Sequence, residues 1–132
     1  MYRKQFLTFA AFIASTIGAI ALFFPTFLLV DMKAAAPSET GIVMARTAGA
    51  FLLSIGVLNF LVRTDGSSKT LASILLATVV LQMLILPVDP IAYFAGVYGS
   101  VMSFVPNTIL HFGLLAAFIH FWRATKVEVV GQ

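Results

Sequence analysis

The stretch that decides the fold is GIVMARTAGAFLL, from Gly41 to Leu53, which begins an apolar run that continues to Val62. The run is long enough for a membrane-spanning helix, because its 22 residues make about 33 Å of helix and the hydrocarbon core of a bilayer is about 30 Å thick. Arg46 interrupts the run. A guanidinium stays protonated in proteins, so its position inside such a run needs a physical reason.

The composition of the whole chain also favours a membrane protein. The 132 residues are 61% hydrophobic and only 10% charged, with a mean hydropathy of +1.04. Soluble domains carry about 25% charged residues, so this chain has too few polar residues to cover a surface in water. The length fits one domain, residues 1–132. The eight Lys and Arg are scattered and form no basic stripe, so nucleic acid is not expected as a partner.

Hydropathy predicts four spans, which cover about residues 7–30, 41–62, 70–88 and 105–122. The first span, with its basic start and the small residues that follow it, resembles a secretory signal. However, the apolar region of a signal is about 7–15 residues long, and this one is longer, which favours an uncleaved span. Before the fourth span, the segment IAYFAGVYGSVMSF (91–104) is too apolar for a solvated loop. We expect it to form a short helix that lies in the outer interface or dips into it.

The distribution of basic residues predicts the orientation of these spans. With a cytoplasmic N-terminus, the inner face holds six basic residues and the outer face two, as the positive-inside rule requires. The inner residues are Arg3, Lys4, Arg63, Lys69, Arg123 and Lys126, and the outer ones are Lys33 and Arg46. The predicted fold is therefore an all-α, antiparallel, transmembrane four-helix bundle with cytoplasmic N- and C-termini.

Small residues on the first two spans predict close helix packing. Ala10, Ala14 and Gly18 are spaced four residues apart, and the second span carries Gly49 and Gly56. Small residues let backbones approach closely in a membrane, where lipid supplies no hydrophobic drive. The simple interpretation is packing between the two spans within one chain, and a homodimer seam is the alternative.

The outer half of the predicted bundle is irregular. All five prolines lie toward it, and Pro25 falls inside the first span, where it removes a backbone hydrogen bond and clashes with the preceding turn. The helix should therefore kink or unwind there. Irregular backbone at membrane depth is tolerated only where protein or a water-filled cavity surrounds it. A pocket that opens outward is the natural place for function.

Arg46 belongs to the outer half. It either extends its head to the lipid headgroups or pairs with a carboxylate or an anionic ligand inside the bundle. Candidate partners at similar depth are Asp89 and His111, with Gln82 deeper and Glu39 before the second span. We predict that these five residues line a ligand-binding pocket. The alternative for Glu39 and Asp89 is that they are ordinary loop acids in water.

Several kinds of chemistry are disfavoured by the residues present. The chain has no Cys, which excludes disulfides, Cys-ligated metals and thiol redox chemistry. His111 and His120 are nine residues apart on one predicted helix, and therefore lie on opposite faces. They cannot ligate the same iron within a monomer, so we expect no metal and no cofactor.

At RTAGAFLLSIGVLNFLVR the sequence resembles the arginine-then-glycine helix of DoxX-like and similar small four-span bacterial families. The matching residues are Arg46, Gly49, Gly56 and Arg63, and the resemblance covers chiefly the second span and the overall hydropathy. It implies a four-helix bundle in a bacterial inner membrane. Some members of such families resemble accessory subunits of quinone-linked redox systems. No catalytic residue carries over.

Three functional hypotheses follow from these observations. The first is a protein that binds a lipid, a quinone or another amphipathic small molecule in a pocket open to the outer leaflet. The second is a non-catalytic accessory or scaffold subunit, as a homo-oligomer or in a larger membrane complex. The third is a membrane enzyme that uses Asp89 or His111 for proton transfer.

Overall fold

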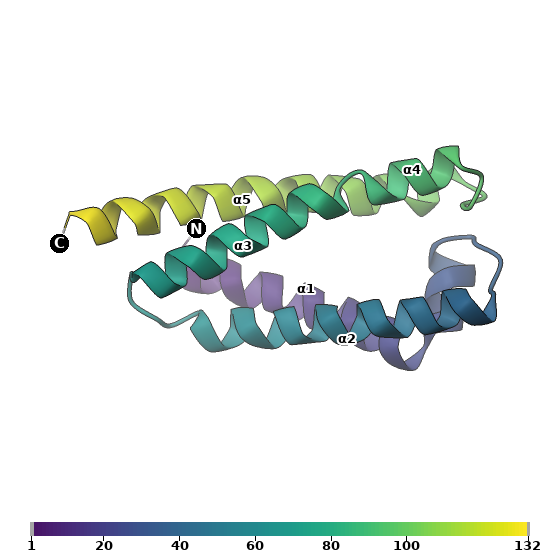
Figure 1. The fold of residues 1–132 in the computed structure, drawn as a ribbon, viewed down its shortest axis with the longest axis horizontal. Coiled ribbons are helices and arrows are strands. Elements are labelled where there is room, and N and C mark those ends of the chain that lie inside the picture. The colour runs from purple at the N-terminus through teal and green to yellow at the C-terminus, as the bar shows by residue number, and fades with distance from the viewer. Residues whose placement is uncertain (1, 132) are drawn as a thin grey trace.

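The computed structural model describes residues 2–131, and within that range all regular structure is helical (Figure 1). Four helical segments are long and apolar enough to cross a membrane: Arg3–Phe23, Glu39–Val62, Lys69–Phe94 and Val101–Val130. The elements are α1 (Arg3–Phe23), η1 (Phe27–Met32), α2 (Glu39–Val62), α3 (Lys69–Ile85), α4 (Val88–Phe94), η2 (Val101–Ser103) and α5 (Val105–Val130). The four spans predicted from hydropathy correspond to these segments.

The long helices pack in two pairs, α1 with α2 and α3 with α5. In Figure 1 both ends of the chain lie toward the left, near the turn that joins α2 to α3, and α4 lies at the right. We call the end that carries Arg3 and the turn at residues 63–68 the terminal end. We call the end that carries η1 and α4 the distal end.

Glycines allow α1 and α2 to touch backbone to backbone. A Cβ atom added to Gly18 would lie 2.6 Å from the Leu53 nitrogen, and one added to Gly49 would lie 2.5 Å from the Leu22 nitrogen. Farther along the same pair, a Cβ on Gly56 would meet the Ser15 hydroxyl. The simple interpretation of the small residues, close packing between the first two spans, is therefore confirmed.

Local residue choices set the helix ends. Phe24, the residue before Pro25, leaves the helical region with φ −128° and ψ 54°, because the proline ring clashes with a helical conformation at the preceding residue. The predicted break at Pro25 is therefore confirmed, and the chain continues in the π-helical turn η1. The hydroxyls of Ser38 and Ser68 accept hydrogen bonds from Gly41 N–H and Leu71 N–H, which caps α2 and α3.

The segment predicted before the fourth span forms α4, a loop and η2. Pro87 separates α4 from α3. Pro90 is tolerated within the first turn of α4, where backbone N–H groups have no helical partner in any case. The loop after α4 turns at Gly96, whose φ of 75° suits glycine.

Apolar side chains from all four long helices fill the terminal half of the molecule. Leu7 and Leu75 are fully buried, and the Phe6 ring packs edge-on against Phe118 and stacks on Phe121, with centroids 4.7 and 5.0 Å apart. We call this cluster the apolar seal. Its members are Phe6, Leu7, Ala10, Val62, Leu71, Leu75, Val79, Leu114, Phe118 and Phe121.

A hydrogen-bond network closes the terminal end beyond the seal. The Arg3 guanidinium donates to the Ser67 hydroxyl at 2.9 Å, to the Thr125 hydroxyl at 3.2 Å and to the Asp65 carbonyl at 2.7 Å. Ser67 in turn donates to Glu128. The network ties α1 to the α2–α3 turn and to α5, so it holds the two helix pairs together at this end.

Candidate functional site

A buried carboxylate organises the distal end. Asp89 lies in the first turn of α4 and is buried. Its Oδ2 accepts from Lys33 Nζ at 2.5 Å and from Asn107 Nδ2 at 2.6 Å, and its Oδ1 accepts from the Tyr98 hydroxyl at 2.9 Å. We call these four residues the Asp89 cluster. Three donors on one carboxylate hold it in a single orientation and compensate for much of its lost hydration.

The Asp89 cluster joins parts of the chain that are far apart in sequence. Lys33 follows η1, and its ammonium lies 5.2 Å from the centre of the Tyr98 ring as well as against Asp89. Beside it, the Ala34 carbonyl accepts a hydrogen bond from Gly99 N–H at 3.2 Å. These contacts connect the segment between η1 and α2, which carries Lys33 and Ala34, to α4 and to the loop that follows α4.

Tyr98 acts as a hydrogen-bond donor in this cluster. Burial, together with the hydrogen bond to Asp89 and the negative charge of that carboxylate, raises the pKa of Tyr98 above its ordinary value of 10.0. The phenol therefore keeps its proton at neutral pH, and its O–H donates a hydrogen bond to Asp89 Oδ1.

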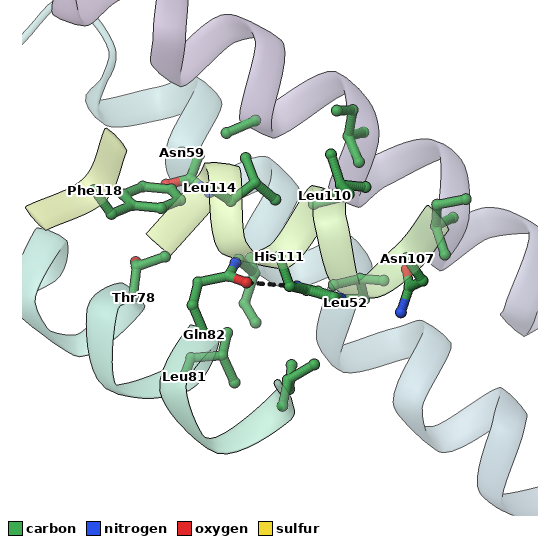
Figure 2. Close-up of a pocket in the computed structure, with 16 residues that line it drawn as sticks. Leu52, Asn59, Thr78, Leu81, Gln82, Asn107, Leu110, His111, Leu114 and Phe118 are labelled. Atoms are coloured by element: carbon green, nitrogen blue, oxygen red, sulfur yellow. Dashed lines mark hydrogen bonds between the residues drawn. The ribbon is translucent and has the colours of Figure 1, made fainter. Parts of the chain in front are cut away.

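A second polar pair lies deeper, between α3 and α5. His111 Nδ1 is 2.5 Å from Gln82 Oε1 (Figure 2). A carbonyl oxygen can only accept, so with the Gln82 amide in this orientation Nδ1 carries the ring proton and donates the hydrogen bond. Asn107, a member of the Asp89 cluster, and His111 lie one helical turn apart on α5. The Gln82–His111 pair is therefore next to the cluster, on the side toward the middle of the bundle.

The Gln82–His111 pair lines an interior cavity of about 60 Å³ between the four long helices. Figure 2 shows Thr78 and Gln82 on α3, Asn107 and His111 on α5, and Asn59 on α2 among the residues around it. Most of the remaining lining is aliphatic. The cavity is therefore an apolar chamber with a few convergent polar groups, the usual make-up of small-molecule sites.

An open groove of about 360 Å³ adjoins this cavity at the distal end. Ile17, Asn107 and Leu110 line both the groove and the cavity. The other groove residues are Leu28, Met32, Lys33, Met102, Ser103 and Pro106. The groove thus combines apolar walls with the Lys33 ammonium and the Asn107 amide from the Asp89 cluster.

The structure brings together some of the five residues predicted for the pocket and separates others. Gln82 and His111 are hydrogen-bonded, and Asn107, one turn from His111, connects them to Asp89. Arg46 and Glu39 are exposed, and neither has an ion pair within residues 2–131. The expectation that Arg46 faces acidic partners in the pocket is therefore corrected, because Lys33 provides the cation beside Asp89. The exposure of Arg46 fits its alternative interpretation, extension toward the headgroups.

Sequence reasoning missed Lys33 and Tyr98 as site residues. Their only signal was position, since Lys33 directly follows the first span and Tyr98 lies in the apolar segment after the third. The alternative interpretation of Asp89 as an ordinary loop acid in water is wrong, because the residue is buried and paired with Lys33.

Comparison with known proteins found no matching family model, no matching curated protein and no matching solved structure. The resemblance to DoxX-like families therefore stays a prediction.

Proposed function

We propose that the chain is an antiparallel four-span bundle of a bacterial inner membrane, with cytoplasmic termini. The four apolar helical segments support spanning. The excess of basic residues at the terminal end supports its placement on the cytoplasmic side. The distal end then lies at the outer leaflet.

We further propose that the groove binds an amphipathic small molecule, such as a lipid or a quinone, from the outer leaflet. The observation that carries this proposal is the distal groove itself, in which apolar walls lie beside Lys33 and Asn107. The ammonium has three N–H groups, of which Asp89 Oδ2 accepts one. The remaining donors suit a carbonyl or phosphate oxygen on the head of the guest, while its apolar body contacts Ile17, Leu28 and Leu110.

Filling the groove tests this proposal. Leu28→Trp places a larger side chain in the groove and should lower the affinity for the guest at least tenfold, which is about 1.4 kcal/mol. Two probes distinguish the sources of the head group: decylubiquinone for a carbonyl head and dioctanoyl phosphatidylglycerol for a phosphate head. Titration followed by native mass spectrometry in a mild detergent measures both affinities.

Two variants serve as controls. Leu84→Trp adds the same bulk to an exposed position of α3 outside the groove, and Arg46→Gln removes the exposed arginine. Both should bind the probes as the original chain does. Equal affinity in Leu28→Trp and Leu84→Trp, or failure of both probes to bind the original chain, would refute the groove as the site.

The other two hypotheses stay predictions. An accessory subunit or homo-oligomer gains no support from the small residues of α1, since Gly18 is already occupied by α2. Proton transfer by Asp89 gains none either, because three donors from the same chain already hold its oxygens.

A further inference from the structure

A line of polar side chains runs from the distal end into the middle of the bundle. It starts at Asp89, which accepts a hydrogen bond from Asn107. His111 lies one turn farther along α5. His111 pairs with Gln82, and Thr78 lies one turn of α3 beyond Gln82 on the wall of the same cavity.

The line ends at a buried acceptor that no protein group satisfies. Asn59 is 2% exposed, and its Oδ1 has no hydrogen-bond partner within residues 2–131. Thr78 cannot supply a proton, because its hydroxyl donates to the Ile74 carbonyl at 3.0 Å. An unmet buried polar atom costs about 1–3 kcal/mol. The Oδ1 atom has almost no contact with the cavity space, so a small donor in the cavity removes this cost when the Asn59 amide turns its oxygen toward it.

The cavity has the room and the chemistry for that donor. One water molecule needs about 10–15 Å³ of such space and two to four polar partners, and the cavity measures about 60 Å³. Asn59, Gln82, His111 and Asn107 supply amide and imidazole groups around it. A wholly aliphatic cavity of this size would stay dry.

The residues around the cavity differ at its two ends. Toward the terminal end lies the apolar seal, whose Phe118 and Leu114 also form the cavity wall. Toward the distal end the wall residues Ile17, Asn107 and Leu110 are shared with the open groove. A molecule that enters the cavity from the groove therefore meets the seal and stops.

We propose that the cavity is a water-binding site in which water hydrogen-bonds to Asn59 and forms a one-sided hydrated passage from the distal end to the level of Thr78. The proposal does not require a guest in the groove, although a guest there would lie at the entrance of the passage. Because the seal closes it, the passage hydrates the inside of the bundle without connecting the two aqueous phases.

The absence of Cys from the chain makes this testable with single cysteines and silver ions. Ag⁺ is close to water in size and reacts with thiols in hydrated sites. Thr78→Cys places a thiol on the cavity wall, and Leu75→Cys, three residues earlier on the same helix, places one in the seal. Val97→Cys and Gly66→Cys, at the distal and terminal ends, report the orientation of the protein in vesicles through an impermeant maleimide.

In chloride-free buffer, Ag⁺ added at the distal side should block the thiol of Thr78→Cys at least tenfold faster than that of Leu75→Cys. Ag⁺ added at the terminal side should block neither. Protection of Thr78→Cys from both sides would show a dry cavity. Reaction of Thr78→Cys from both sides would show an open seal. Either result overturns the proposal.

A second measurement avoids cysteine and any effect of Ag⁺. Asn59→Leu replaces the amide with an aliphatic side chain of similar size. If water satisfies Asn59, the amide and its water are lost together, and the Tm should stay within about 3 °C of the original value. If the amide is unsatisfied, the same substitution removes a penalty of about 1–3 kcal/mol and raises the Tm by more than about 3 °C, and that result contradicts water binding even where Thr78→Cys reacts.

Discussion

Gly49→Val is expected to separate α1 from α2 and to lower the free energy of unfolding by about 3 kcal/mol or more. Even the first added carbon would lie 2.5 Å from the Leu22 nitrogen and 2.8 Å from the Gly18 carbonyl oxygen. Both neighbours are backbone atoms, so no rotamer change relieves the overlap. Overpacking of a close-packed interior costs about 1–3 kcal/mol when side chains can adjust, and here they cannot. Thermal unfolding in detergent, followed by circular dichroism, measures the loss.

The matched control for this variant is Gly113→Val. Gly113 also lies inside a long helix, but a Cβ there meets no atom within 4 Å apart from the adjoining backbone of its own helix. Its substitution should leave the stability within about 1 kcal/mol of the original chain. Similar losses in the two variants would mean that helix propensity, and not close approach of α1 to α2, accounts for the effect.

Asp89→Leu is expected to lower the free energy of unfolding by about 3 kcal/mol. The substitution leaves the Lys33 ammonium, the Tyr98 hydroxyl and the Asn107 amide without their acceptor, and loss of one partner from a buried ion pair costs about 3–5 kcal/mol. The lower value applies because the side chains of the pair are 16% and 13% exposed. Asp31→Leu, at an exposed carboxylate of η1, should change the stability by less than about 0.5 kcal/mol.

A double-mutant cycle separates the ion pair from the rest of the Asp89 cluster. Lys33→Met should cost less than Asp89→Leu, because Asp89 keeps its bonds from Tyr98 and Asn107. The double variant Lys33→Met/Asp89→Leu should lose about 1–2 kcal/mol less than the sum of the two single losses. Chemical unfolding of the four proteins provides the values. Strict additivity would show that Lys33 and Asp89 do not interact in the membrane protein.

The long helices and the α1–α2 contact were predictable from the sequence because they depend on local features. Apolar runs of spanning length, the break at Pro25 and the small residues at Gly18 and Gly49 each act within one or two turns of helix. The prediction that α2 ends near Val62 needed only the polar turn that follows. These features therefore do not depend on how distant parts of the chain pack.

The candidate site was predictable only in part, since it depends on long-range geometry. Asp89, His111 and Gln82 stood out because polar groups are rare in apolar runs. Lys33 did not stand out, because its direction is set by the π-helical turn η1. A change of one residue in that turn would point the side chain away from Asp89. Arg46 shows the converse error, in which a conspicuous charge on α2 faces outward.

The position of the apolar seal also determines how a membrane voltage acts on this protein. In the membrane orientation proposed above, and with the cavity hydrated from the distal end, the voltage falls mainly across the layer of lowest dielectric constant, which is the packed layer around Phe6, Leu7 and Phe118 in the terminal half. One elementary charge that crosses the whole potential exchanges about 2.3 kcal/mol per 100 mV. Lys33 and Asp89 lie outside that layer, so they share the electrical potential of the solution at their own end. Energising the membrane should therefore leave their ion pair intact.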